Sequence, residues 1–471
     1  MLELGCGNGN NLVPMAWTFP ESEFVGVDLA GKPIATGQQM IHELGLSNVR
    51  LLQGDIAEID ESWGKFDYII AHGLFSWVPP KVQESILRLS KRLLSPEGMA
   101  FVSYNAFPGG HLRSMIREML LFHLRGERSP SERVQEGKAF LRFLAGGQEK
   151  TDEYRLWLKA ELGRVLDHSE GHFFHDELAE INQPFYFTQF IERAAGNDLQ
   201  YVGEADYFEM SDYIFTEPVQ QTLQSLGRNR ILREQYLDFL KCRCFRQTLL
   251  CHRDVKLWNE ANPAVIRDFH VSLRGAVANN ATGRGENTQF ETSKGARFET
   301  DFALGKIALG ILEKGSPFPI PFRELLDKAL QEQTLAGAAV QQAEENLSRF
   351  LLELYGAGVV ELRTRLPLFA STVSDRPMVN PVARWQIKGG NFCTSVFHTA
   401  IQVEDEIGRW LLNAMDGSLN HHQLGDGVWQ FLQSKDALNI PPGGETVARK
   451  EIEETLQRNL RKLVRLGLLI S

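Results

Sequence analysis

The first ten residues, Met1-Leu2-Glu3-Leu4-Gly5-Cys6-Gly7-Asn8-Gly9-Asn10, decide the fold that we expect for this chain. A short apolar run with one acid leads into a G-x-G-x-G turn, and residues 11–16 then favour a helix. Glycine suits such a turn because the backbone needs φ values that other residues resist, and because a missing Cβ lets a ligand approach the main chain. The first turn of the helix offers unpaired N–H groups to an anion. The stretch therefore predicts a strand, a nucleotide-cofactor loop and a helix.

The spacing of glycines and acids indicates which cofactor this loop holds. A dinucleotide fingerprint is G-x-G-x-x-G, and here the third glycine, Gly9, comes one residue early, which disfavours pyrophosphate. Residues 24–28 predict a second strand that ends at Asp28, whose carboxylate can accept both hydroxyls of a ribose. Residues 51–56 predict a third strand that ends with Asp55. Three acids at strand ends suit a cationic cofactor without phosphate, and S-adenosylmethionine is such a molecule.

These residues resemble the class I S-adenosylmethionine-dependent methyltransferases, whose motif around the first strand, E/D-x-G-x-G-x-G, matches Glu3 to Gly9. In that family the glycine loop wraps the methionine moiety, the acid that ends strand two holds the ribose, and the acid after strand three meets the adenine amine. The resemblance implies a cofactor-binding set of Glu3, Gly5, Cys6, Gly7, Asp28, Leu29, Asp55, Ile56 and His72.

The acceptor side of the sheet is expected after the next two strands. Residues 66–71 predict a fourth strand that is apolar enough to be buried on both faces, and residues 99–105 predict a fifth. Ligands of such sheets lie outside the carboxyl ends of the strands, so residues 72–77 and 104–107 are the expected walls. The aromatic candidates are Phe75, Trp77, Tyr104 and Phe107, and core packing is the alternative for each.

Three of these positions are the predicted catalytic residues. Trp77 and Tyr104 would desolvate and align an acceptor, because aromatic faces hold methylated ammonium and sulfonium groups by cation–π attraction. His72 would accept a proton or line the cofactor through its backbone.

The whole chain predicts an α/β protein: a Rossmann-like, doubly wound class I methyltransferase sheet with a helical insertion, followed by helical and winged-helix-like C-terminal domains. Only four residues precede the glycine loop, so we expect the first domain to be truncated at its N-terminus. The expected divisions are 1–107 for the cofactor domain, 108–184 for the helical insertion, 185–209 for the last helix–strand unit of the sheet, 210–274 for a helical regulatory region, 275–300 for a linker or a hairpin around Ser293-Lys294-Gly295, 301–370 for the first winged-helix-like repeat, and 371–471 for a linker and the second repeat.

The two C-terminal repeats are indicated by an internal similarity at an offset of 109 residues. The recurring positions are Glu344, Glu345, Leu347, Arg349, Leu351, Leu354 and Gly358, which return as Glu453, Glu454, Leu456, Arg458, Leu460, Leu463 and Gly467. Each copy follows two shorter helical segments and leads into an apolar strand, as in a winged helix. Because these helices mix Glu with Arg, we expect them to contact protein and not DNA.

Composition excludes several other classes of protein. The 471 residues carry a net charge of −10, and the pI near 5.7 argues against nonspecific nucleic-acid binding as the main activity. A hydrophobic content of 43% is ordinary for a globular protein, so we expect no membrane span. We also expect no signal peptide, because the first apolar run is too short and lacks a basic flank. Five cysteines fit a reducing cytoplasm. We interpret residues 238–252 as helical, so Cys242 and Cys244 would lie on different faces and no metal site is predicted.

The remaining parts also carry a resemblance. Residues 168–178, 182–187 and 245–252 look like the methyltransferase regulatory-domain family, and residues 410–417 look like its C-terminal domain. Members of that family include the rickettsial outer-membrane-protein lysine methyltransferases, so the resemblance implies a protein substrate and a lysine acceptor. The alternative is a catalytically weak cofactor-binding scaffold whose winged helices recruit protein partners. The sequence does not indicate an oligomeric state.

Overall fold

The computed structural model describes residues 1–147, 152–226, 229–258, 261–274, 288–291, 297–333, 339–435 and 444–471. The chain forms two compact units that each draw on several segments. Unit 1 comprises Met1–Gly5, Gly54–Asp206 and Thr216–Leu257. Unit 2 comprises Cys6–Gln53, Tyr207–Phe215 and Trp258–Ser471.

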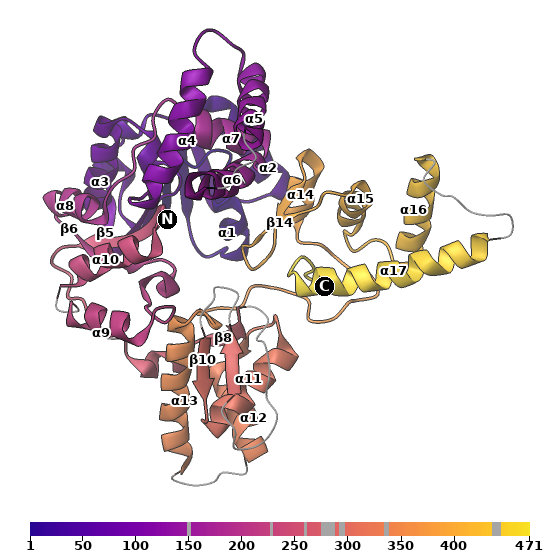
Figure 1. The fold of residues 1–471 in the computed structure, drawn as a ribbon. Coiled ribbons are helices and arrows are strands. Elements are labelled where there is room, and N and C mark those ends of the chain that lie inside the picture. The colour runs from indigo at the N-terminus through magenta and orange to yellow at the C-terminus, as the bar shows by residue number, and fades with distance from the viewer. Residues whose placement is uncertain are drawn as a thin grey trace. The chain divides into compact units, whose positions relative to one another are not determined.

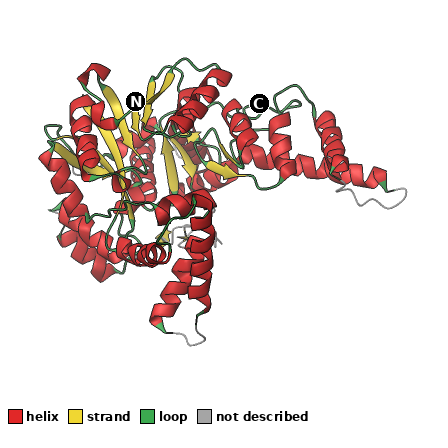
Figure 2. Ribbon diagram, turned by 90° about the horizontal axis from the view of Figure 1, so that it is seen from above, coloured by secondary structure: helices red, strands yellow, loops and turns green. Residues whose placement is uncertain are grey.

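A seven-stranded sheet with the order β3-β2-β1-β4-β5-β7-β6 confirms the expected Rossmann-like architecture. Its strands are β1 Leu2–Leu4, β2 Phe24–Asp28, β3 Val49–Gln53, β4 Phe66–Ala71, β5 Leu94–Asn105, β6 Leu199–Glu204 and β7 Phe245–His252. β4 pairs in parallel with β1 and β5, whereas β7 pairs antiparallel with both β5 and β6. Helices flank the strands of the sheet (Figure 2).

Burial follows the expectation for parallel strands in β2 but only in part of β4. Four of the five residues of β2 are buried, as strands covered on both faces require. In β4, Asp67 and Tyr68 are exposed, and the register with β5 shifts between Phe66 and Tyr68. The prediction of burial along the whole of β4 was therefore wrong for its first half.

Helices and short 3-10 turns accompany this sheet. They are α1 Leu12–Thr18, α2 Gly31–Leu44, α3 Pro80–Leu93, α8 Phe187–Gly196, α9 Glu217–Ser225 and α10 Arg230–Lys241, with short 3-10 turns η1 Ile56–Glu58, η2 Glu61–Trp63, η3 Phe75–Trp77 and η4 Tyr207–Met210. Between β5 and α8 lie four helices, α4 Gly109–His123, α5 Pro130–Gly146, α6 Glu153–Leu166 and α7 Glu170–Leu178. These four pack around their own apolar core, which includes Leu120, Leu141, Leu162 and Phe173 (Figure 1).

We expected residues 238–252 to be helical, but they do not form one helix. α10 ends at Lys241, where Cys242 adopts a left-handed conformation with φ of +47°, and the chain then enters β7. Arg246, Thr248 and Leu250 alternate along one buried side of this strand. β7 lies between β5 and β6, so the unit at 185–209 is not the last of the sheet, and residues 210–274 are not wholly helical.

The first C-terminal repeat contains three helices and a small sheet. The helices are α11 Ala303–Gly315, α12 Phe322–Gln333 and α13 Ala339–Gly356, preceded by η5 Pro263–Asp268. The sheet has the order β11-β8-β12, with β11 Ile320–Pro321, β8 His270–Leu273 and β12 Val360–Arg363. β8 precedes the expected boundary at residue 275, because its Val271 and Leu273 join the same core as Leu309 and Phe322. β9 Thr288–Glu291 and β10 Arg297–Thr300 pair antiparallel, and residues 293–295 of the expected hairpin lie outside the described residues.

The second repeat has its own helices and hairpin. They are α14 Pro381–Gly389, β13 Phe392–Thr394, β14 Ala400–Gln402, α15 Glu406–Ala414, α16 His421–Ser434 and α17 Glu445–Arg465. The apolar segment after α17 reaches back along the chain, and Leu469 forms an antiparallel bridge with Val379. Leu456, Leu460, Leu468 and Leu469 share one core with Leu411 and Leu424. Within the described ranges, no helix has the length and apolarity that crossing a bilayer would require.

Candidate cofactor and acceptor sites

The glycine loop turns as the sequence predicted. Gly5, Gly7 and Gly9 all have positive φ, at 74°, 55° and 75°. A Cβ built at Gly7 would meet no atom within 4 Å, so the main chain there faces open space that a ligand can use. A Cβ at Gly9 would instead lie 2.7 Å from Cδ1 of Leu51, so this glycine is required by packing.

The glycine loop orients the carboxylate of Asp28. Its Oδ2 accepts a hydrogen bond from Gly7 N at 2.9 Å, and its Oδ1 accepts one from Ala30 N at 2.8 Å. Each carboxylate oxygen has two acceptor sites, so one remains on each oxygen for a further donor. The structure therefore brings Gly7 and Asp28 together and holds the carboxylate in one orientation at the end of β2.

The other predicted cofactor residues lie in different surroundings. Leu29 is exposed, whereas Glu3, Cys6 and Ile56 are buried. Asp55 is not the last residue of β3, which ends at Gln53. It instead caps η1, where its Oδ1 accepts a hydrogen bond from Ala57 N at 2.8 Å.

His72 follows β4 and lies beside two aromatic rings. Its ring centroid is 5.7 Å from that of Phe101 on β5 and 6.4 Å from that of Phe245 on β7. Partial burial of the imidazole lowers the pKa of His72, because burial disfavours the charged imidazolium. The lowered pKa favours the neutral imidazole at pH 7.

Tyr104 is a core residue and not a pocket wall. Its side chain is 1% exposed, and its ring stacks on Phe190 with centroids 4.1 Å apart. Its hydroxyl lies 3.2 Å from Oγ1 of Thr248, and burial raises its pKa well above the ordinary value. Phe75 packs against the same rings and is fully buried. The expectation that Tyr104 meets an acceptor was wrong, because β7 and α8 cover this side chain.

Trp77 is half-buried at the end of η3 and contacts the helical insertion. Its ring lies 4.9 Å from that of His175 on α7. Nδ1 of His175 lies 2.8 Å from Oδ1 of Asp176, and Nε2 of His172 lies 2.9 Å from Oδ2. Although partial burial opposes it, the bond to His175 and the charges of both histidines lower the pKa of Asp176. The carboxylate of Asp176, which contacts His175, is thus anionic at neutral pH.

Residues 182–186 connect η3, which follows β4, with the carboxyl end of β5, an arrangement that the sequence did not predict. Gln183 N donates to Ser76 O at 2.8 Å, and Phe107 N donates to Phe185 O at 2.9 Å. The Asn105 side-chain amide donates to Oδ1 of Asn182 at 2.9 Å.

These contacts place Tyr186 beside Phe107, which follows β5, and beside His111 in the first turn of α4. The ring of Phe107 stacks on that of His111 at 4.0 Å and lies 5.2 Å from that of Tyr186. Nε2 of His111 is 3.3 Å from the Tyr186 hydroxyl. Of the predicted aromatic wall, Trp77 and Phe107 remain accessible, and His111, His175 and Tyr186 join them. The segments 168–178 and 182–187 carried a family resemblance, but no residue in them showed a catalytic pattern by itself.

The cysteine run forms no metal cluster in the described part of the chain. Cys242 ends α10, Cys244 lies in the loop, and Cys251 is buried on β7. All five cysteines are free thiols. Among the residues that the structure describes, no group of three or more His, Cys, Asp or Glu side chains could hold a metal ion.

Unit 2 has a pocket beside the glycine loop that the sequence did not indicate. Its volume is about 580 Å³, and Trp385 Nε1 at its wall donates to Oε2 of Glu43 on α2 at 3.0 Å. The lining residues from the loop and α1 are Asn8, Asn10, Asn11 and Pro14, and those from the second repeat include Gln386, Asn391, Thr394 and His398. The second repeat therefore contacts the segment that follows the cofactor loop.

Three family models match the chain in succession. A methyltransferase domain matches residues 1–98, a predicted methyltransferase regulatory domain matches residues 170–252, and the PKMT C-terminal winged helix domain matches residues 375–468. Together they follow the order that the sequence predicted.

Similar proteins cover nearly the whole chain. Uncharacterized protein RP789 of Rickettsia prowazekii is 30% identical over 465 residues, which are 96% of this chain and 82% of that protein. The structure of PKMT2 from Rickettsia typhi superposes with a TM-score of 0.87 at 27% identity and covers all of this chain and 93% of that one. A structure of PKMT2 in complex with AdoHcy gives a TM-score of 0.86 at 27% identity, with coverage of 100% and 94%.

Proposed function

Because this chain belongs to the family of S-adenosylmethionine-dependent methyltransferases that carry a regulatory domain and a PKMT winged helix, we propose that its acceptor is a protein lysine side chain. The activity and the cofactor belong to the family as a whole: the chain is a methyltransferase, and S-adenosylmethionine is its methyl donor. The lysine acceptor is supported above all by the full-length match to PKMT2 at a TM-score of 0.87.

The residues of the glycine loop fit S-adenosylmethionine. The open space beside Gly7 leaves room for the methionine moiety, and the remaining acceptor sites of Asp28 suit the two ribose hydroxyls. Leu29 follows Asp28 and is exposed, so it offers an apolar surface to adenine. We propose that these residues, with Asp55 and Ile56 toward the adenine edge, bind the cofactor.

The cofactor supplies a methyl group on a sulfonium, and the protein must supply an aligned, neutral amine. A lysine ammonium with a pKa of about 10.4 costs roughly 4.6 kcal/mol to deprotonate at pH 7. An apolar aromatic surface lowers this cost because it disfavours the charged form. The amine nitrogen then forms a bond to the methyl carbon, the carbon–sulfur bond breaks with its electron pair on sulfur, and the amine proton leaves to a base.

We assign the acceptor to the carboxyl edge of β4 and β5. Trp77 and Phe107 would flank the lysine stem, with His175 and Tyr186 behind them. The anionic Asp176 would attract the incoming ammonium, since it lies beside His175. Neutral His72 is the proposed proton acceptor, in keeping with its lowered pKa. Alignment of this kind can supply several kcal/mol without a covalent intermediate.

Radiolabelled methyl transfer tests the proposal. The protein is incubated with methyl-labelled S-adenosylmethionine and a bacterial protein extract, and labelled sites are located by mass spectrometry. We expect label on lysine side chains, and Asp28→Ala is the control that removes cofactor binding. Label on another residue type, or on RNA alone, would show that lysine is not the acceptor.

The free state of all five cysteines supports a further proposal, that the enzyme works in a reducing compartment such as the cytoplasm.

A further inference from the structure

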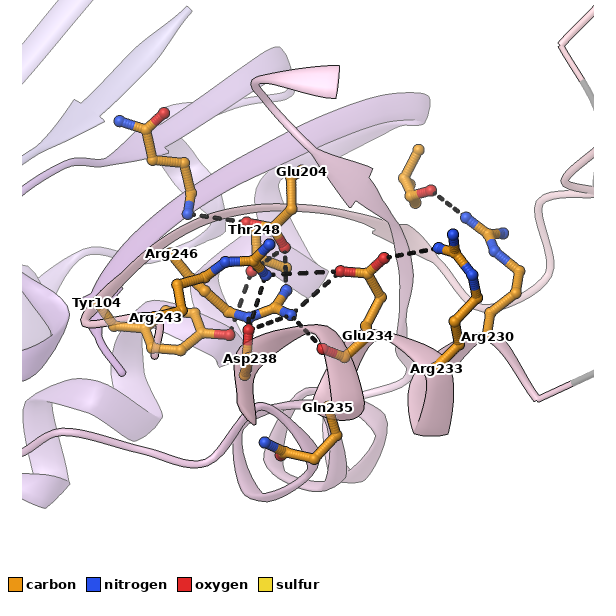
Figure 3. Close-up of polar contacts among 12 residues, drawn as sticks. Tyr104, Glu204, Arg230, Arg233, Glu234, Gln235, Asp238, Arg243, Arg246 and Thr248 are labelled. Carbon is orange, nitrogen blue, oxygen red and sulfur yellow. Dashed lines mark hydrogen bonds and ion pairs between the residues drawn. The ribbon is translucent and has the colours of Figure 1, made fainter. Parts of the chain in front are cut away.

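Helix α10 buries charged side chains and exposes apolar ones, the reverse of an ordinary surface helix. Its Glu234 and Asp238 are buried, and both bind the guanidinium of Arg246 on β7, at 3.1 and 2.9 Å. Arg246 also binds Glu204 of β6 and lies over the Phe187 ring at 3.8 Å. These carboxylates converge on Arg246 at the buried side of the helix (Figure 3).

The outward face of α10 carries a continuous apolar stripe. Its members are Leu232, Tyr236, Phe239 and Leu240, which are 37%, 44%, 48% and 45% exposed. Their spacing of i, i+4, i+7 and i+8 places them on one side of the helix. Rolling the helix to bury this stripe would break the ion pairs with Arg246 and leave buried charges unpaired, which is strongly unfavourable. The stripe therefore stays in solvent unless another molecule covers it.

The stripe continues into the acceptor edge. The Tyr236 ring is 6.0 Å from the Phe239 ring, and the Phe239 ring is 6.2 Å from that of Tyr186. Tyr186 in turn lies 5.2 Å from Phe107, which follows β5. All these residues belong to unit 1, so the aromatic path runs within one compact body.

We propose that the α10 stripe docks the acceptor protein, by binding apolar side chains that flank the methylated lysine. This inference rests on the proposed lysine acceptor at Phe107 and Tyr186. Three ring-to-ring distances separate Tyr236 from Phe107. Roughly five residues of extended peptide, at ~3.3 Å each, span their sum. The preferred acceptor thus has Leu, Phe or Tyr about four or five residues from its lysine, and the specificity of the enzyme lies partly in α10.

Two synthetic peptides test this inference. One carries a lysine with Phe and Leu four and five residues to either side, and the other has Ser at those four positions. We expect wild-type enzyme to have a KM at least tenfold lower for the apolar peptide. Phe239→Ser and Leu240→Ser should each remove most of that preference and leave kcat and cofactor affinity unchanged. Leu156→Ser is the matched control, because Leu156 is a 59% exposed residue of α6 away from the stripe.

Each alternative outcome has its own signature. Equal KM values for the two peptides with wild-type enzyme, or an unchanged preference in both stripe variants, would overturn the docking role of α10. The stripe variants could instead show a lower molar mass than wild type by light scattering, with KM raised equally for both peptides. That result would assign the stripe to contact with a second copy of this chain. Failure of wild-type enzyme to methylate any lysine, in the peptides or in the extract, would overturn the proposed acceptor and not the docking step alone.

Discussion

Among single side chains, Asp28 is the one on which cofactor binding depends most directly. Its carboxylate orders Gly7 and Ala30 and has acceptor sites left for a ribose. We expect Asp28→Ala to weaken S-adenosylmethionine binding at least tenfold, on the order of 1.4 kcal/mol or more, in calorimetry. Asp60→Ala is the matched control, since Asp60 accepts bonds from Ser62 in the same way but at η2. Equal affinity in the two variants would contradict the assignment.

Tyr104 belongs to the interior, and its substitutions separate packing from chemistry. Tyr104→Phe keeps the ring stack on Phe190 and removes only the contact with Thr248, so we expect a loss of about 1 kcal/mol in the free energy of unfolding. Tyr104→Ala should cost about 3–5 kcal/mol, as removal of a buried aromatic ring does. Denaturant unfolding measures both, and methyl transfer by the folded Tyr104→Phe variant should be unchanged. A tenfold loss of turnover in that variant would restore a catalytic role.

Trp77 differs from Tyr104 because it remains accessible beside His175. We expect Trp77→Ala to lower turnover at saturating cofactor by tenfold or more, roughly 1.4 kcal/mol, because the amine loses its aligned and desolvated position. Cofactor affinity should stay within about threefold. Trp157→Ala on α6 provides a control for loss of a half-buried indole in the helical insertion. Normal turnover with normal stability would place the acceptor elsewhere.

At the level of elements, the buried ions between α10, β6 and β7 hold the regulatory segment to the sheet. Arg246 faces Glu204, Glu234 and Asp238 (Figure 3). Arg246→Met would remove the one guanidinium that binds all three of these buried carboxylates, so we expect a loss of about 3–5 kcal/mol in the free energy of unfolding at pH 7. Arg253→Met is the control, because Arg253 is exposed.

This loss should depend on pH in a predictable direction. Burial raises the pKa of Glu234 and of Asp238, even though Arg246 and Arg243 oppose the shift. An acid whose pKa is raised in the folded state stabilises the fold fully below its ordinary pKa, and this contribution is lost as the pH rises through the folded value. Without Arg246 both pKa values should rise further. The difference in stability between wild type and Arg246→Met should therefore shrink from pH 8 to pH 5.5, and a constant difference would show that neither acid titrates there.

For the whole molecule, the acidic balance bears on what the winged helices contact. The net charge is −10, and a groove beside α17 mixes Lys450, Arg458 and Arg461 with Glu453 and Glu454. Phosphate attraction needs an excess of basic groups, so we expect random duplex DNA to bind no more tightly than ~10⁻⁶ M at physiological salt. Fluorescence anisotropy against a labelled duplex measures this. Nanomolar binding with a steep salt dependence would assign these domains to nucleic acid.

The sequence by itself determined the cofactor half of the sheet. Local chemistry predicts the glycine loop, β2 with Asp28, and strands one to five in their order along the chain. Glycines with positive φ and acids at strand ends lie within a few residues of the elements that they indicate. The motif also indicated the cofactor, since its spacing disfavours a dinucleotide. The repeat at an offset of 109 residues likewise indicated the winged helices that the PKMT model confirms in part.

Only the tertiary structure decided the rest, and the reason is pairing over long sequence separations. Arg246 and Thr248 occupy inward positions of β7, so the sequence lacks the alternation of apolar and polar residues that would predict a strand. Arg246 can be buried there because Glu204, Glu234 and Asp238 surround it. Tyr104 became a core residue through Thr248, 144 positions away. His111 and Tyr186 meet across 75 positions. A side chain's local pattern cannot state whether such a distant partner will bury it or leave it facing an acceptor.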